Sequence, residues 1–197
     1  MGVDIRSEKN LGLIGSILSI VSGFVGVVPY VGAFGGSLSL VGFILILVAL
    51  HGIGNKLGDD RPFKYYLYSV IVAVAGIIIA VILVIFVIFG TLAVFPPAEF
   101  DHGFPVAGVG IILMAFLGLI VILIVSTYFA KQAWEAMYEI TGVKEFHETA
   151  RWLWWGALTA IILVGFILLL VAAIFQIIAF ANLPEEIEER PAAEPAL

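Results

Sequence analysis

Residues 65–94 read YYLYSVIVAVAGIIIAVILVIFVIFGTLAV, a run of 30 residues without a charged side chain. An α-helix needs about 20 predominantly apolar residues to cross the roughly 30 Å hydrocarbon layer of a bilayer, because each residue adds about 1.5 Å. This run is long enough to cross with a tilt or to extend into the headgroup layer. It predicts that the chain is an integral membrane protein.

The composition of the whole chain agrees with this segment. Of the 197 residues, 62% are hydrophobic and 12% are charged, whereas a soluble domain is about 25% charged. A water-soluble fold of this size cannot bury so much apolar surface. Because the chain has no cysteine, disulfide scaffolds, thiol chemistry and cysteine-ligated metal sites are excluded. The net charge of −6 argues against nucleic acid as a partner.

Four more apolar runs lie on either side of this segment, and together they predict an all-α, polytopic transmembrane helical bundle of five spans. The expected spans cover residues 11–28, 31–50, 65–94, 105–130 and 152–181, within a single membrane-embedded domain over residues 1–183. The first two form a tight, Gly/Ser-rich hairpin, which is either two thin spanning helices or a re-entrant loop. Residues 184–197 are acidic and contain proline, so they predict a disordered tail.

The positions of lysine and arginine predict the orientation, because short loops rich in these residues stay on the cytoplasmic side. With five crossings, eight of the nine fall on the side of the N-terminus: Arg6, Lys9, Lys56, Arg61, Lys64, Lys131, Lys144 and Arg151. Arg190 falls on the other side. We therefore expect a multi-pass protein of the cell membrane with a cytoplasmic N-terminus and an extracytoplasmic C-terminus.

The third, fourth and fifth spans lack the groups that membrane chemistry requires. Their central turns carry no acidic, basic or histidine side chain, and the polar residues there are chiefly Ser126, Thr127, Thr159 and Gln176. Ion-coupled transport normally uses an intramembrane carboxylate or a broken helix. Intramembrane hydrolysis needs a Ser/His pair, an Asp pair or a His-Glu-x-x-His helix. We therefore predict no catalytic residue, no metal and no cofactor.

Small residues recur at spacings of three and four in the first hairpin, a pattern that lets helix backbones approach closely. The predicted helix-packing residues are Gly12, Gly15, Gly23, Gly26, Gly32 and Gly36. One alternative is oligomerisation through Gly32 and Gly36. Another is that Ser16, Ser19 and Ser22 border a polar path for water or a small solute.

Charged residues cluster on the predicted cytoplasmic face. A surface of mutually paired charges is one interpretation. The functional alternative is a small polar pocket for an ion or a lipid headgroup, formed by His51, Asp59, Asp60, His147 and Glu148. No two of these residues stand at a diagnostic metal-ligand spacing. In the same region, residues 131–140 predict an amphipathic helix that Gly142 ends.

Several short motifs carry a resemblance to a known family. They are VPYVG at 28–32, ILILVALHG at 44–52, GDDRPF at 58–63, TGVKEF at 141–146 and GA at 156–157. In their order and spacing the chain resembles the uncharacterised prokaryotic, mainly archaeal, membrane family known as domain-of-unknown-function family 996. The resemblance implies a multi-pass membrane protein and supplies no catalytic residues. Family members tend to have Ala-Gly where this chain has Ala150-Arg151, which places a charge before the last span.

These observations lead to one main functional hypothesis and two alternatives. The main hypothesis is a non-catalytic membrane protein that acts through helix packing, either with itself as a homo-oligomer or with a membrane protein partner. The first alternative is a small-solute channel or permease along the serine stripe. The second is a lipid-modifying enzyme that uses Asp59, Asp60, His147 and Glu148. The lipid bilayer is an expected partner in every case.

Overall fold

The computed structural model describes residues 2–26, 32–94, 106–160 and 164–188. Its elements in chain order are β1 (Gly2–Asp4), α1 (Arg6–Gly26), α2 (Gly32–Leu57), α3 (Arg61–Val94), α4 (Val106–Thr141), α5 (Lys144–Leu158), α6 (Val164–Ala181) and β2 (Glu186–Glu188). Five of these helices are long and apolar enough to cross a membrane, and α5 is not among them. The prediction of an all-α polytopic bundle is confirmed.

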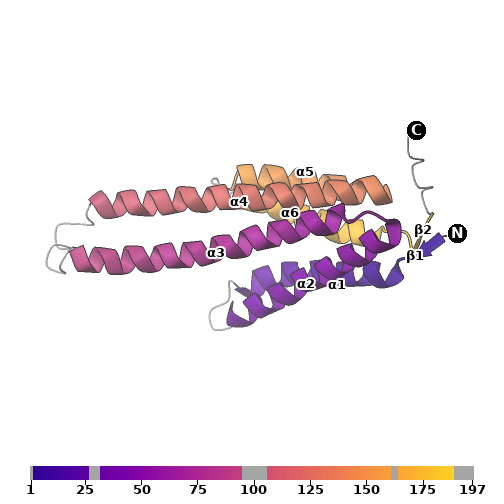
Figure 1. The fold of residues 1–197 in the computed structure, drawn as a ribbon, viewed down its shortest axis with the longest axis horizontal. Coiled ribbons are helices and arrows are strands. Elements are labelled where there is room, and N and C mark those ends of the chain that lie inside the picture. The colour runs from indigo at the N-terminus through magenta and orange to yellow at the C-terminus, as the bar shows by residue number, and fades with distance from the viewer. Residues whose placement is uncertain (1, 27–31, 95–105, 161–163, 189–197) are drawn as a thin grey trace.

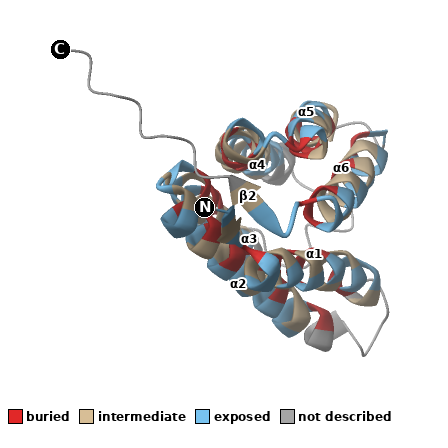
Figure 2. Cartoon of the chain, turned by 90° about the vertical axis from the view of Figure 1, so that its right-hand side faces the viewer, coloured by how far each residue is buried: buried red, intermediate tan, exposed pale blue. Residues whose placement is uncertain are grey.

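The helices form a ring in which each packs against its neighbours in the sequence. In chain order, α1 packs against α2, and this continues helix by helix to α6, which packs back against α1. Viewed along the bundle, the helices surround a shared axis (Figure 2), and the two short strands lie at one end of it (Figure 1). The first hairpin is confirmed as a tight antiparallel pair, α1 and α2, although its link at residues 27–31 lies outside the described residues.

The two ends of the chain lie side by side. Strand β1 pairs antiparallel with β2, so that Val3 stands opposite Ile187. The amide of Ile5 donates a hydrogen bond to the carbonyl of Glu185 at 2.9 Å, and the Ile5 side chain is fully buried. Figure 1 shows β1 and β2 together at one end of the bundle. The two described ends of the chain therefore meet at one end of the bundle, whereas the predicted topology places the termini at opposite ends.

The reason is a reversal within the predicted fifth span, 152–181. Helix α5 ends at Leu158, and α6 begins at Val164 and runs back beside it (Figure 1). Gly165 makes the reversal possible, because a Cβ there would collide with the backbone of Thr159 and Ala160. Gly156 likewise lets Leu169 of α6 approach closely. The prediction of one continuous helix over 152–181 is wrong, and residues 161–163 lie outside the described residues.

The predicted disordered tail is partly ordered. Residues Glu186–Glu188 form β2, and Leu183, the residue before the predicted tail, is almost fully buried. The tail is held because Arg6 pairs with Glu185 at 2.8 Å and the Lys9 ammonium donates to the Leu183 carbonyl at 2.8 Å. Residues 189–197 lie outside the described residues.

An aromatic cluster forms the core at the end where the termini meet. The rings of Trp134 and Phe146 stack with centroids 5.7 Å apart, and Phe180 meets both rings edge-on. Tyr66 packs edge-on against Trp134 at 5.5 Å. The amphipathic stretch predicted over 131–140 is the last part of α4, whose apolar face enters this cluster. Gly142, with φ of 73°, follows the end of this helix as predicted.

Close contact between α1 and α2 depends on a missing side chain at Gly15. A Cβ at this position would lie 2.7 Å from the Gly42 carbonyl oxygen and 2.9 Å from Cγ1 of Ile46. Gly15→Ala is therefore expected to lower the free energy of unfolding by about 1–3 kcal/mol, the usual cost of overpacking. The measurement is thermal unfolding in detergent, followed by circular dichroism.

Gly23→Ala on the same helix is the matched control, because nothing lies within 4 Å of its added Cβ. Alanine favours a helix by about 1 kcal/mol over glycine, so this variant should be at least as stable as the parent. Equal thermal unfolding midpoints for Gly15→Ala and Gly23→Ala would contradict the close approach of α1 and α2.

Candidate functional site

The serine stripe of α1 bonds to its own helix. Ser16 donates to the Gly12 carbonyl at 2.7 Å, Ser19 to the Gly15 carbonyl at 2.9 Å and Ser22 to the Ser19 carbonyl at 2.8 Å. Ser16 and Ser22 are buried. Each of these hydroxyls therefore already donates its hydrogen to a backbone carbonyl, as serines in membrane helices commonly do. The stripe supports packing of α1 better than a polar path.

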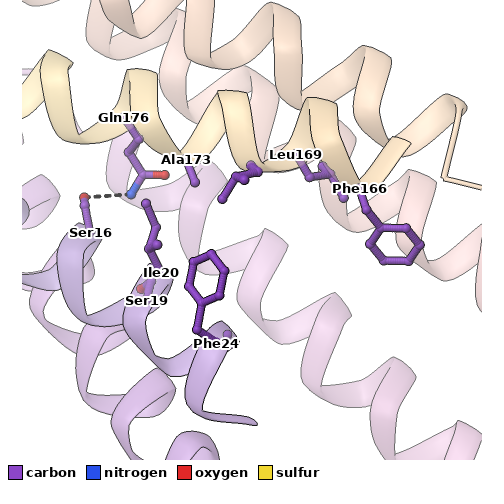
Figure 3. Close-up of a pocket in the computed structure, with 10 residues that line it drawn as sticks. Ser16, Ser19, Ile20, Phe24, Phe166, Leu169, Ala173 and Gln176 are labelled. Atoms are coloured by element: carbon purple, nitrogen blue, oxygen red, sulfur yellow. Dashed lines mark hydrogen bonds between the residues drawn. The ribbon is translucent and has the colours of Figure 1, made fainter. Parts of the chain in front are cut away.

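One of these serines is joined to α6 by Gln176. The Gln176 amide nitrogen donates to the Ser16 hydroxyl oxygen at 2.8 Å. Beside this bond, α1 and α6 enclose a groove of about 560 Å³, whose walls include Phe24 and Phe166. Figure 3 shows Gln176 at one end of the groove with its amide oxygen turned away from Ser16. The groove is otherwise almost entirely apolar, so it offers no continuous route for polar solutes.

A second cavity, of about 520 Å³, lies inside the helix ring and is called the central cavity below. It is lined by five helices, α2 to α6, and Gln176 is shared with the α1–α6 groove. Most of the lining is apolar. Its polar side-chain groups are the hydroxyls of Ser39, Tyr66, Ser69, Ser126 and Thr127, the indole N–H of Trp134 and the amide of Gln176. Pockets of about 300–1,000 Å³ with a few polar groups are typical of small-molecule sites.

The polar groups of the central cavity are not all used by the protein. Ser126 donates to the Ser69 carbonyl at 3.0 Å, and the two hydroxyls lie 3.3 Å apart. By contrast, the hydroxyls of Ser39, Tyr66 and Thr127 have no hydrogen-bond partner within the described part of the chain. Tyr66 and Thr127 are each only 6% exposed. In the described residues, the one fully buried side-chain nitrogen or oxygen without a partner is Nε1 of Trp152, so the Tyr66 and Thr127 hydroxyls are open to the cavity that they line.

The predicted cytoplasmic-face pocket is divided among separate local contacts. His51 shares a hydrogen bond with Asn55 at 3.0 Å, and its ring lies 4.8 Å from that of Phe63. His147 packs against Tyr138, with ring centroids 5.5 Å apart. Asp59, Asp60 and Glu148 each pair with a cation on a nearby residue. Within the described ranges no group of three or more His, Cys, Asp or Glu side chains is placed to hold a metal.

Ion pairs dominate the end of the bundle that carries the termini. The pairs are Arg6 with Glu185, Lys56 with Glu8, Arg61 with Asp59 and Glu139, Lys64 with Asp60, Lys131 with Glu135, and Arg151 with Glu148. Hydrogen bonds from the Arg61 guanidinium lower the pKa of the Asp59 carboxyl below its usual 3.8. Exposed pairs each contribute only about 0–1 kcal/mol. Their arrangement favours a structural surface over a reaction centre.

The predicted packing glycines differ in what surrounds them. Gly12 lies directly against the ring of Phe180, and Gly15 lies against Gly42. No atom lies within 4 Å of a Cβ built on Gly23 or Gly36, which instead line the groove and the central cavity. Gly26 ends α1 and Gly32 begins α2, and the surroundings of both lie outside the described residues.

The central cavity itself was missed by the sequence analysis. The sequence marks Gln176 as one of few polar residues at membrane depth, but no pattern links it to Tyr66 or Thr127. The only available signal was that each is a polar residue within an apolar run. Their proximity arises from three different helices, so no local spacing could reveal it.

Comparisons with known proteins agree with the resemblance of the motifs. The model of the family DUF996, described as a protein of unknown function, matches residues 38–174. A protein of Methanocaldococcus jannaschii with the name "Uncharacterized protein MJ1644" is 35% identical over 192 residues, which cover 94% of this chain and 97% of the relative. No solved structure matches the chain. Both the length of the family match and the extent of this relative show that the chain belongs to the DUF996 family of proteins of unknown function.

Proposed function

We propose that the chain is a non-catalytic protein of the cell membrane that acts by lateral helix packing, with itself or with a membrane protein partner. The end that carries the termini faces the cytoplasm in this proposal. Support comes from the lysines and arginines of the described residues, which occur near the starts of α1 and α3, the ends of α2 and α4, and in the first half of α5. Because consecutive helices run in opposite directions, these starts and ends lie at the same end of the bundle. The positive-inside rule assigns that end to the cytoplasm.

The observation that carries the packing proposal is the length of α3 and α4. They have 34 and 36 residues, whereas α1 has 21 and α6 has 18. Figure 1 shows them continuing together beyond the ends of the other helices. We call the half of α3 that ends at Val94 and the half of α4 that begins at Val106 the outer arm.

The outer arm exceeds what one bilayer crossing requires. From Tyr65 to Val94 the apolar run has 30 residues, about 45 Å of helix, against roughly 30 Å of hydrocarbon. Helices longer than the hydrocarbon layer tilt or associate to reduce the mismatch. Only 6% of the most apolar part of α3 is buried inside the chain, compared with 28% for α2. Among the candidate spans, α3 therefore leaves the largest share of its surface for a partner helix.

Disulfide crosslinking tests this association directly, because the chain has no native cysteine. Phe86→Cys and Met114→Cys place thiols at side chains that are 71% and 74% exposed on the outer arm. Oxidation in native membranes is expected to give a covalent dimer or an adduct with a membrane partner. Gel mobility and mass spectrometry distinguish these two products.

Ile14→Cys is the control, because this side chain is 50% exposed on α1, away from the arm. It should stay monomeric under the same oxidation. Monomers alone from both arm variants, together with a monomeric mass in mild detergent and no co-purifying membrane protein, would overturn the packing proposal.

A further inference from the structure

We propose that the central cavity binds a neutral amphipathic lipid, one with an uncharged hydroxyl or carbonyl group on an apolar chain. The first reason is the charge of the lining. Phe43, Val74 and Leu153 are typical of its walls, and no acidic side chain, basic side chain or histidine is among the described residues that line it. A charged headgroup would lose its hydration there without gaining a counter-charge, whereas hydrogen bonds alone can offset the smaller desolvation cost of a neutral hydroxyl or carbonyl.

The second reason is the presence of polar groups without protein partners. Tyr66 and Thr127 line the cavity, are each about nine-tenths buried, and make no hydrogen bond within the described residues. A hydroxyl donates one hydrogen bond and accepts others, so the pair can both donate to and accept from a ligand hydroxyl. Trp134, edge-on to Tyr66 at 5.5 Å, restricts the phenol ring and gives the ligand a rigid wall.

The third reason is access from the bilayer. Helices α2 and α3 are connected through Gly58 at the end with the termini and diverge towards the other end (Figure 1). The cavity is lined on this side by Gly36 and Leu40 of α2 and by Ala73 of α3. Nothing lies within 4 Å of a Cβ on Gly36, so the wall is thin at this point. A lipid can enter sideways between the two helices with its polar group leading.

Quenching of Trp134 fluorescence tests the proposal in the full-length chain. Trp152, Trp154 and Trp155 are replaced by Phe, which leaves Trp134 in the cavity wall as the only tryptophan, and this residue is excited selectively. The protein is placed in nanodiscs of unlabelled phosphatidylcholine. Nitroxide-labelled stearyl alcohol is then added, with nitroxide-labelled stearate in its carboxylate form and nitroxide-labelled phosphatidylcholine as comparison probes.

The labelled alcohol is expected to quench Trp134 fluorescence to a saturating level. The two comparison probes should quench it only in linear proportion to their concentration. Thr127→Val keeps the side-chain shape and removes the hydroxyl. It should lower the affinity for the alcohol by about fivefold, which corresponds to the loss of one hydrogen bond. Thr159→Val is its matched control, because the Thr159 hydroxyl already bonds to the Trp155 carbonyl and does not line the cavity. This control should leave the affinity unchanged.

A second measurement does not rely on the tryptophan replacements. Lipids extracted from the purified parent chain and from Gly36→Leu are compared by mass spectrometry, with Gly23→Leu in the α1–α6 groove as the control. A neutral lipid should accompany the parent and the control and be lost from Gly36→Leu. Equal, non-saturable quenching by all three probes would mean that ordinary acyl chains fill the cavity and would overturn the proposal. Retention of the same lipids by Gly36→Leu would overturn it too.

Discussion

Cysteines introduced at Asp4 and Asn182 are expected to react with a membrane-impermeant maleimide from the same side of the membrane. Both side chains are exposed, they belong to the two ends of the chain, and the β1–β2 pair holds those ends together. The absence of native cysteine makes the labelling specific. Inside-out vesicles should label both variants completely, because the positively charged end is expected in the cytoplasm.

Asp101→Cys is the control for the opposite side. It falls in the connection between α3 and α4, which run away from the termini and back towards them (Figure 1). This variant should label only in right-side-out vesicles. Labelling of Asn182→Cys together with Asp101→Cys would restore the five-span topology and would contradict the reversal between α5 and α6.

Phe180→Ala is expected to lower the free energy of unfolding by about 3–5 kcal/mol, the usual cost of truncating a buried Phe. Its ring is fully buried, lies 5.3 Å from that of Phe146 and contacts α1 at Gly12. One side chain of α6 therefore joins three helices around Trp134. Thermal unfolding in detergent should show a large fall in the midpoint.

Phe86→Ala is the matched control, because this side chain is 71% exposed on the outer arm of α3. Its truncation should change the midpoint little, since lipid or detergent contacts the site in the folded and unfolded states alike. Similar losses in the two variants would mean that the aromatic cluster is not the stabilising core of the ring.

Much of the helical structure could be predicted from the sequence because it depends on neighbouring residues. Apolar runs identify helices that lipid can surround, since a helix satisfies its own backbone hydrogen bonds. Gly142 could be recognised as a helix terminator because a positive φ suits glycine. The small residues Gly12 and Gly15 were correctly associated with packing, although their partners, Phe180 and Gly42, could not be named.

The fifth span shows why apolar length alone was insufficient. Residues 152–181 are apolar enough for one long helix, and hydropathy does not record where a helix reverses. The reversal depends on Gly156 and Gly165, which permit contacts between α5 and α6 that exist only when the chain has folded back. The same residues would be tolerated in a straight membrane helix, so the pattern alone does not distinguish the two structures.

By itself, the sequence determined that this is a polytopic helical membrane protein with a charged end and an apolar interior. Those properties follow from the length and composition of each segment, which are local. Only the tertiary structure decided that the termini pair and that Tyr66, Thr127 and Gln176 line one cavity. These residues come from α3, α4 and α6, and their proximity is produced by closure of the ring, a property of all the helices together.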